Sequence, residues 1–267
     1  AGPSDTRSSE PPADPTALYL LLAARCFAWT GDHGFLFDEW PRIGRAASTG
    51  GRHSNADPSS AAIRAAALRE LAAAAQDIGR PAELATLSPS PSRTEAAAAG
   101  SEINASVALV LGGTATPDRV AEWLRQCVGS ATGATESGGG YHAALSLAGL
   151  VHGVIGAQPD APRQRLALRP CLPAEWTSLR GARFSLGDTV VAMDLATNGD
   201  RRTFTFEQVA GAVPVRLAFE PALPVSTFRA VEVDGALARL DTRPFHGRIV
   251  APVQLVLDHE RTVSFFW

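Results

Sequence analysis

The chain has 267 residues, and its 24 basic and 27 acidic side chains give a formal net charge of -3. No basic surplus is present for binding nucleic acid, and we expect no membrane span because no run of about 18 apolar residues occurs. The length is enough for two modest domains, each with its own hydrophobic core.

The N-terminal part of the chain shows helical patterns. Residues 1–12 are polar and Pro-rich, and we expect them to be disordered. Asp14 followed by Pro15 is typical of an N-cap and a first-turn proline, and apolar residues at helical spacing continue to Trp29. A second short helix after Asp32 would complete a helical hairpin. Further helices are predicted after Asp57, over Ser101–Leu111, after Thr116 and over Tyr141–Ile155.

After Pro159 the pattern changes to short alternating segments that read as strands. Asn198-Gly199 and Asp234-Gly235 are typical hairpin turns. This pattern predicts an antiparallel β-sandwich over residues 158–267, preceded by a helical domain over 13–157. The predicted strands are 182–186, 189–196, 202–209, 213–219, 229–233, 248–257 and 262–267.

Two groups of motifs resemble the six-hairpin glycosidases, which include α-L-rhamnosidases and glycogen-debranching-type glucosidases. The first group spans the junction between the predicted helical domain and the sandwich, and the second is the N-terminal hairpin. The junction motifs are Tyr141-His142-Ala143-Ala144-Leu145, Gly149 to Gly156, Pro159-Asp160-Ala161-Pro162, Leu166-Ala167-Leu168-Arg169-Pro170 and Leu172-Pro173-Ala174-Glu175-Trp176. The hairpin motifs are Asp14-Pro15-Thr16-Ala17-Leu18-Tyr19-Leu20, Trp29-Thr30-Gly31-Asp32, Phe35-Leu36 and Trp40-Pro41.

The resemblance implies an α + β multidomain fold, in which a partial (α/α) helical-hairpin toroid is followed by the antiparallel β-sandwich. The toroid would be incomplete because only about six helical segments precede residue 157. The implied activity is hydrolysis of glycosidic bonds in oligo- or polysaccharides by an inverting mechanism, which needs one carboxylic acid and one carboxylate base.

The resemblance places the general base at Glu136, just before the helix that begins near His142. The family usually has an aromatic residue directly before this Glu, whereas this chain has Thr135. Glu102 is the candidate general acid, with Glu95 as an alternative, although the family's acid motif is absent around both. Each of these carboxylates has a simpler interpretation as a solvated surface group.

Four further residues are candidates for substrate binding. His142 could orient a sugar hydroxyl or hold Glu136, and Tyr141 and Trp29 could stack on a pyranose ring. Asp14 would lie near the sugar by resemblance. The simpler alternatives are a surface or capping role for His142, a core position for Trp29 and the N-cap role for Asp14.

We expect no metal and no cofactor. The six histidines and three cysteines show no ligand spacing, and the Gly-rich residues 138–140 lack the motif of a phosphate-binding loop. No signal peptide is visible at the start of the chain, which slightly favours a cytoplasmic location. The expected partner is a carbohydrate, while a non-catalytic carbohydrate-binding or structural role, and self-association through exposed helix faces, remain alternatives.

Overall fold

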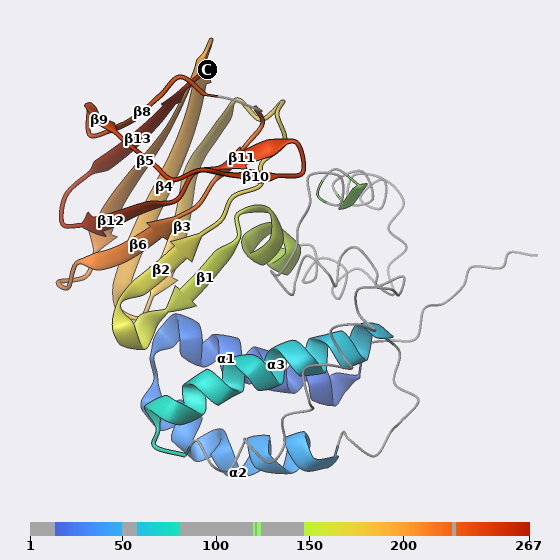
Figure 1. The fold of residues 1–267 in the computed structure, drawn as a ribbon. Helices are drawn as coiled ribbons and strands as arrows, with labels where there is room; N and C mark the ends of the chain where they lie inside the picture. The colour runs from blue at the N-terminus through green and yellow to red at the C-terminus, as the bar shows by residue number, and fades with distance from the viewer. Residues whose placement is uncertain (1–13, 50–57, 81–119, 121, 124–146, 226–227) are drawn as a thin grey trace, which may run out of the picture. The chain divides into compact units, whose positions relative to one another are not determined.

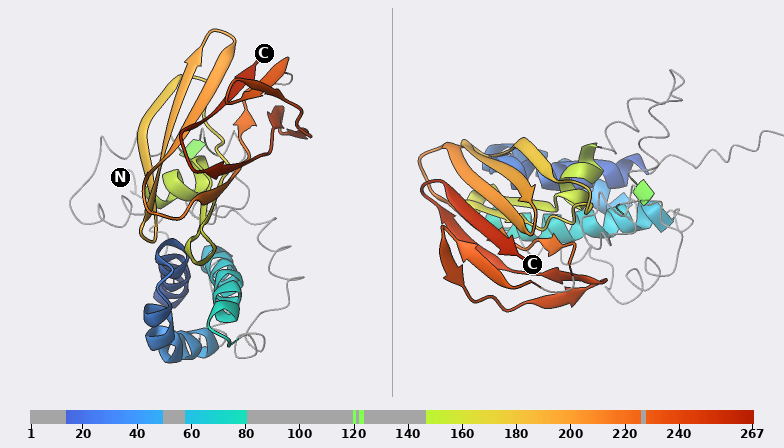
Figure 2. Two further views of the ribbon diagram at one scale, coloured as in Figure 1. Left: turned by 90° about the vertical axis from the view of Figure 1, so that its left-hand side faces the viewer. Right: turned by 90° about the horizontal axis from the view of Figure 1, so that it is seen from above.

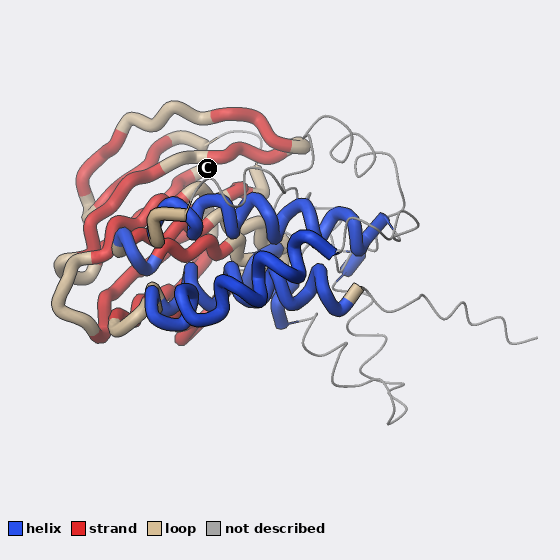
Figure 3. The backbone as a smooth tube through the Cα atoms, turned by 90° about the horizontal axis from the view of Figure 1, so that it is seen from below, coloured by secondary structure: helices blue, strands red, loops and turns tan. Residues whose placement is uncertain are grey.

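The computed structural model describes residues 14–49, 58–80, 120, 122–123, 147–225 and 228–267 (Figure 1). The chain divides into two compact units. The first contains Ala1–Arg25 and Leu36–Ile103, and the second contains Cys26–Phe35 and Asn104–Trp267. Within the described residues the first unit is helical and the second is mostly β, as the blue and red segments of Figure 3 show.

Three α-helices are present in the described residues of the N-terminal part: α1 (Pro15–Thr30), α2 (His33–Thr49) and α3 (Pro58–Asp77). The first begins where the sequence predicts it, because the Asp14 carboxylate accepts a hydrogen bond from the Thr16 amide over 2.9 Å. Asp32 caps α2 in the same way by accepting from the Phe35 amide over 2.9 Å. The turn between α1 and α2 contains Gly31, whose φ of 68° favours glycine.

Side-chain contacts join the three helices within the first unit. The Tyr19 hydroxyl donates to Glu39 of α2 over 2.9 Å, and Arg25 forms an ion pair with Glu70 of α3 over 3.5 Å. The helices lie side by side around a shared apolar interior (Figure 2). Its fully buried members are Leu20, Leu36, Ile43, Ile63 and Leu71.

The second unit contains three sheets. The six-stranded sheet has the order β3-β4-β5-β13-β8-β9, the four-stranded sheet β1-β2-β6-β12, and the small sheet β10-β11-β7. The large sheet consists of β3 (Ser178–Leu186), β4 (Thr189–Asn198), β5 (Arg201–Ala210), β8 (Ala230–Val233), β9 (Ala236–Ala238) and β13 (Arg261–Phe266). The four-stranded sheet consists of β1 (Ala157–Asp160), β2 (Arg165–Leu168), β6 (Val215–Phe219) and β12 (Val253–Leu257). The small sheet consists of β7 (Ala222–Leu223), β10 (Arg243–Phe245) and β11 (Arg248–Val250).

The two larger sheets pack against each other through aromatic rings. Phe219 of β6 meets Phe204 and Phe206 of β5 edge-on, with ring centroids 4.7 and 4.8 Å apart. All three side chains are at most 1% exposed. Such rings combine a large buried apolar area with the favourable edge-to-face geometry, so they form the centre of the core between the sheets.

All seven predicted strands are present, with two differences in detail, and the sequence pattern missed β1, β2, β7, β9 and β10. The segment 248–257 divides into β11 and β12 because Pro252, which has no amide hydrogen, interrupts it. The expected purely antiparallel pairing is wrong, since β2 and β6 pair in parallel with Leu166 opposite Leu217. The predicted hairpin at Asn198-Gly199 is confirmed by the pairing of Asn198 with Arg201.

The predicted partial (α/α) toroid is wrong. Beyond the three α-helices of the N-terminal part, the described residues contain a π-helical segment (Gly149–Val154), a short 3-10 turn (Ala161–Arg163) and thirteen strands. The local motifs correctly indicate a helical hairpin at α1 and α2, but ring closure depends on packing between distant hairpins. Short motifs contain no information about that packing.

The junction between the helical pattern and the sheets turns sharply at Gly156. Its φ is 67°, and a Cβ atom built there would lie 2.5 Å from the carbonyl oxygen of Arg169. The Gly156 carbonyl accepts a hydrogen bond from the Arg169 amide over 3.2 Å. The close approach allows β1 to leave the π-helical segment and pair directly with β2.

Candidate functional site

Four of the six predicted site residues lie outside the described residues. These are the two candidate catalytic carboxyls, Glu136 and Glu102, and the candidate binding residues Tyr141 and His142. Their roles stay predictions. Asp14 belongs to the first unit and Trp29 to the second, and both are described.

Asp14 is engaged in holding the start of α1. Besides capping Thr16, its backbone amide donates to the Ser60 hydroxyl of α3 over 2.9 Å. Its charge also acts on Arg64, because it opposes the lowering of the Arg64 pKa that burial causes. These contacts give Asp14 a structural function, which is independent of any contact with a sugar.

Trp29 is half-buried and packs against the core of the second unit. Its ring lies 6.2 Å from that of His152, and its carbonyl oxygen accepts a hydrogen bond from the Gly187 amide over 2.7 Å. His152 Nδ1 in turn lies 2.9 Å from the carbonyl oxygen of Ala157. Trp29 therefore helps to fix the elbow before β1, and only part of its ring is available to a ligand.

Glu70 is a described carboxyl group whose pKa is raised. Its side chain is 36% exposed, and partial burial raises its pKa, an effect that Arg25 partly offsets at 3.5 Å. The sequence pattern gave no sign of Glu70 because its partner lies 45 residues away on another helix.

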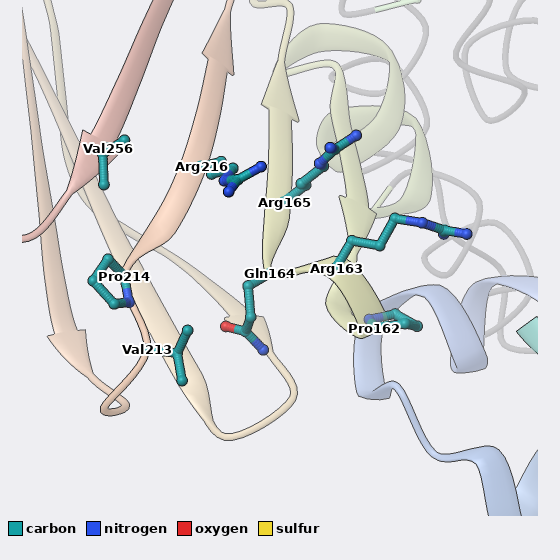
Figure 4. Close-up of a pocket in the computed structure, with 8 residues that line it drawn as sticks. All are labelled: Pro162, Arg163, Gln164, Arg165, Val213, Pro214, Arg216 and Val256. Atoms are coloured by element: carbon teal, nitrogen blue, oxygen red, sulfur yellow. The ribbon is translucent and has the colours of Figure 1, made fainter.

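The exposed face of the four-stranded sheet contains two adjoining shallow depressions, of ≈ 580 and ≈ 610 Å³. Arg165 of β2 and Arg216 of β6 line both. Figure 4 shows these two side chains on neighbouring strands, with Arg163 projecting from the preceding turn. The volumes fall within the range of small-molecule sites, about 300–1,000 Å³. The sequence motifs do not indicate this face, since the pairing of β2 with β6 joins segments about 50 residues apart.

No metal site is formed by the described residues, which contain no group of three or more His, Cys, Asp or Glu side chains that could hold an ion. Within the same residues no helix is long and apolar enough to cross a membrane.

The fold of the chain is similar to that of a glycosidase of known structure. A solved structure that it resembles is an α-L-rhamnosidase from Dictyoglumus thermophilum, with a TM-score of 0.55 and 12% sequence identity. The likeness covers 97% of this chain and 40% of the rhamnosidase chain, so this chain spans well under half the length of that enzyme. No protein-family model and no curated protein sequence matches the chain.

Proposed function

We propose that the chain is a glycoside hydrolase-like protein that cleaves glycosidic bonds in oligo- or polysaccharides. The observation that supports the proposal is the likeness in fold to an α-L-rhamnosidase over 97% of the chain. The junction and hairpin motifs support it independently, because they were recognisable in the sequence without the structure.

The proposed chemistry is inverting hydrolysis. Glu136 is the general base that activates water, and Glu102 is the general acid that protonates the leaving oxygen. Inversion requires the two carboxyl groups to stand about 6.5–9.5 Å apart, so that a water molecule fits between the base and the sugar. Glu95 is the second candidate for the acid.

The first experiment measures hydrolysis of a series of aryl glycosides that includes an aryl α-L-rhamnoside. Glu136→Gln should lower kcat by roughly 10²–10⁴-fold, the usual contribution of a general base. Glu175→Gln is the matched control, because Glu175 is an exposed carboxylate in the second unit. Equal activity of wild type and Glu136→Gln would remove Glu136 from the mechanism.

A second experiment identifies the acid. Loss of a general acid slows glycosides with poor leaving groups far more than activated aryl glycosides, whose oxygen leaves without protonation. Glu102→Gln and Glu95→Gln are therefore each compared on an alkyl and a nitrophenyl glycoside of the same sugar. The variant with the larger ratio between the two substrates identifies the acid, and unchanged ratios in both exclude these two residues.

The alternative is a non-catalytic protein that binds carbohydrate or has a structural role. It is favoured by the short span of the likeness, 40% of the rhamnosidase chain. Saccharide binding without turnover of any glycoside in the series would support this alternative over hydrolysis.

A further inference from the structure

Two arginines face each other on the exposed side of the four-stranded sheet. Arg165 of β2 and Arg216 of β6 are register partners on adjacent parallel strands, and both are exposed. Like charges in directly opposed positions destabilise a sheet. Within the described part of the chain neither guanidinium has an ion-pair partner, since the nearby Asp160 is bound to Arg163 over 3.1 Å.

At the opposite end of the same two strands, the arginines have an acidic partner. Arg169, just after β2, forms an ion pair with Glu220, just after β6, over 3.3 Å. Arg243 also reaches Glu220, over 3.0 Å. Among the described residues, Arg165 and Arg216 lack such a partner, although they lie on the same two strands. The absence of an acidic partner is therefore a local feature of this face and does not follow from the strand pairing.

The surroundings of the two arginines form two cross-strand rows. One row is Asp160, Arg165, Arg216 and Val256, and the neighbouring row is Gln158, Ala167, Ala218 and Gln254. The two central alanines leave a low floor between the glutamines at either edge, and this floor is part of the ≈ 610 Å³ depression. Across four strands the face measures about 14 Å, three inter-strand spacings of about 4.8 Å. That width fits a short oligosaccharide better than a single sugar.

The side chains of this face define the chemistry of a ligand. Two adjacent guanidinium groups provide forked donors that match carboxylate oxygens. Glutamine amides can both donate to and accept from sugar hydroxyls. Neither depression is lined by an aromatic side chain, which disfavours single-stranded nucleic acid because its bases need stacking partners.

We propose that this sheet face binds an acidic saccharide, with a uronate carboxylate held between Arg165 and Arg216 and the sugar ring lying over Ala167 and Ala218. The assignment of the anion to a saccharide rests on the proposed carbohydrate function. The proposed role of this face is to select or anchor a charged substrate, and no bond cleavage is assigned to it.

The test is calorimetric titration of the full chain with an oligogalacturonate and with the same oligosaccharide after complete methyl esterification. The acid should bind at least about tenfold more tightly than the neutral ester, and this preference should shrink as salt is added. Arg165→Gln combined with Arg216→Gln should abolish the preference. Arg169→Gln combined with Arg243→Gln is the matched control, because it removes the same charge from the two arginines that pair with Glu220 and should keep the preference.

Equal affinity for the acid and the ester overturns the inference. If both oligosaccharides bind with this equal affinity, the proposed carbohydrate function is not contradicted. Inorganic sulfate that displaces the oligogalacturonate at equal concentration reduces the face to a simple anion site and overturns the saccharide assignment. A polyuridine oligonucleotide that binds more tightly than the uronate also overturns it. Loss of folding in the double variant is checked by circular dichroism, and Arg165→Lys with Arg216→Lys then keeps the charge while removing the forked geometry, so the preference should still fall.

Discussion

The guanidinium of Arg202 donates a hydrogen bond to the carbonyl oxygen of Trp176 over 3.1 Å, and it does so from an almost completely buried position, 2% exposed. Its Nε donates to the Thr197 hydroxyl over 3.0 Å. Burial lowers the pKa of Arg202, and the nearby Arg248 lowers it further. The neutral oxygens replace the hydrogen bonds to water that the buried guanidinium loses. Because one of them is the Trp176 carbonyl, Arg202 connects the segment before β3 to the large sheet.

Arg202→Ala should destabilise the second unit by about 2–4 kcal/mol, since it leaves buried acceptors without donors and opens a cavity. Urea unfolding followed by tryptophan fluorescence measures the change. Arg180→Ala serves as the control because Arg180 is exposed on β3 of the same sheet, and it should change the free energy of unfolding by less than about 0.5 kcal/mol. Similar effects of the two substitutions would contradict the structural role of Arg202.

Gly156→Ala should lower stability more than an ordinary glycine substitution. The added Cβ would meet the Arg169 carbonyl at 2.5 Å, so the elbow before β1 must shift, and the positive φ adds strain. We expect a loss of about 2–4 kcal/mol, against about 1 kcal/mol for Gly199→Ala. Gly199 has a φ of 59° but no atom within 4 Å of a built Cβ, which isolates the backbone contribution. Thermal unfolding of both variants gives the comparison, and equal losses would show that the close approach has no cost.

Glu70 should make the stability of the first unit depend on pH. Its folded pKa is raised, so the folded state favours the protonated form, and this contribution is present at low pH and is lost as the pH rises through the folded pKa. Because the group is 36% exposed, solvent screening keeps the effect small. Wild type should therefore lose stability relative to Glu70→Gln as the pH rises above the ordinary pKa of a Glu side chain, about 4.3. Denaturant unfolding at several pH values measures this difference.

The pH effect has its own control in Arg25. Arg25→Met removes the positive charge that offsets the rise in the Glu70 pKa, so the loss of stability with rising pH should become steeper. A pH dependence that is unchanged in Arg25→Met, or absent in wild type, would contradict the assignment.

Asp14 allows capping and sugar binding to be separated. Asp14→Ala should cost about 1 kcal/mol, because the Thr16 amide loses its acceptor. Asp14→Asn keeps an equally good cap while removing the charge, so it should leave stability almost unchanged. Saccharide affinity of Asp14→Asn then tests the role implied by the family resemblance: an unchanged affinity limits Asp14 to capping, and a marked fall assigns it a second role.

Some of the functional residues discussed above can be predicted from local sequence, and others cannot. Glu136 is named from its place in a motif, whereas burial in the tertiary structure raises the pKa of Glu70, and Arg25, 45 residues away, partly offsets that rise. The pair of Arg165 and Arg216 could not be predicted from local sequence either, because the two residues become neighbours only through the parallel pairing of distant segments.

Local sequence correctly predicts the features that depend on neighbouring residues. The Asp14 cap, the helical hairpin of α1 and α2, and the Asn198-Gly199 turn follow from local backbone preferences and short-range hydrogen bonds. Three features became known only from the tertiary structure. Within the described residues the helices do not form a toroid, β2 pairs in parallel with β6, and two arginines lie on one face of the sheet. Those outcomes depend on which apolar surfaces bury one another, and that choice is made by packing between segments far apart in the chain.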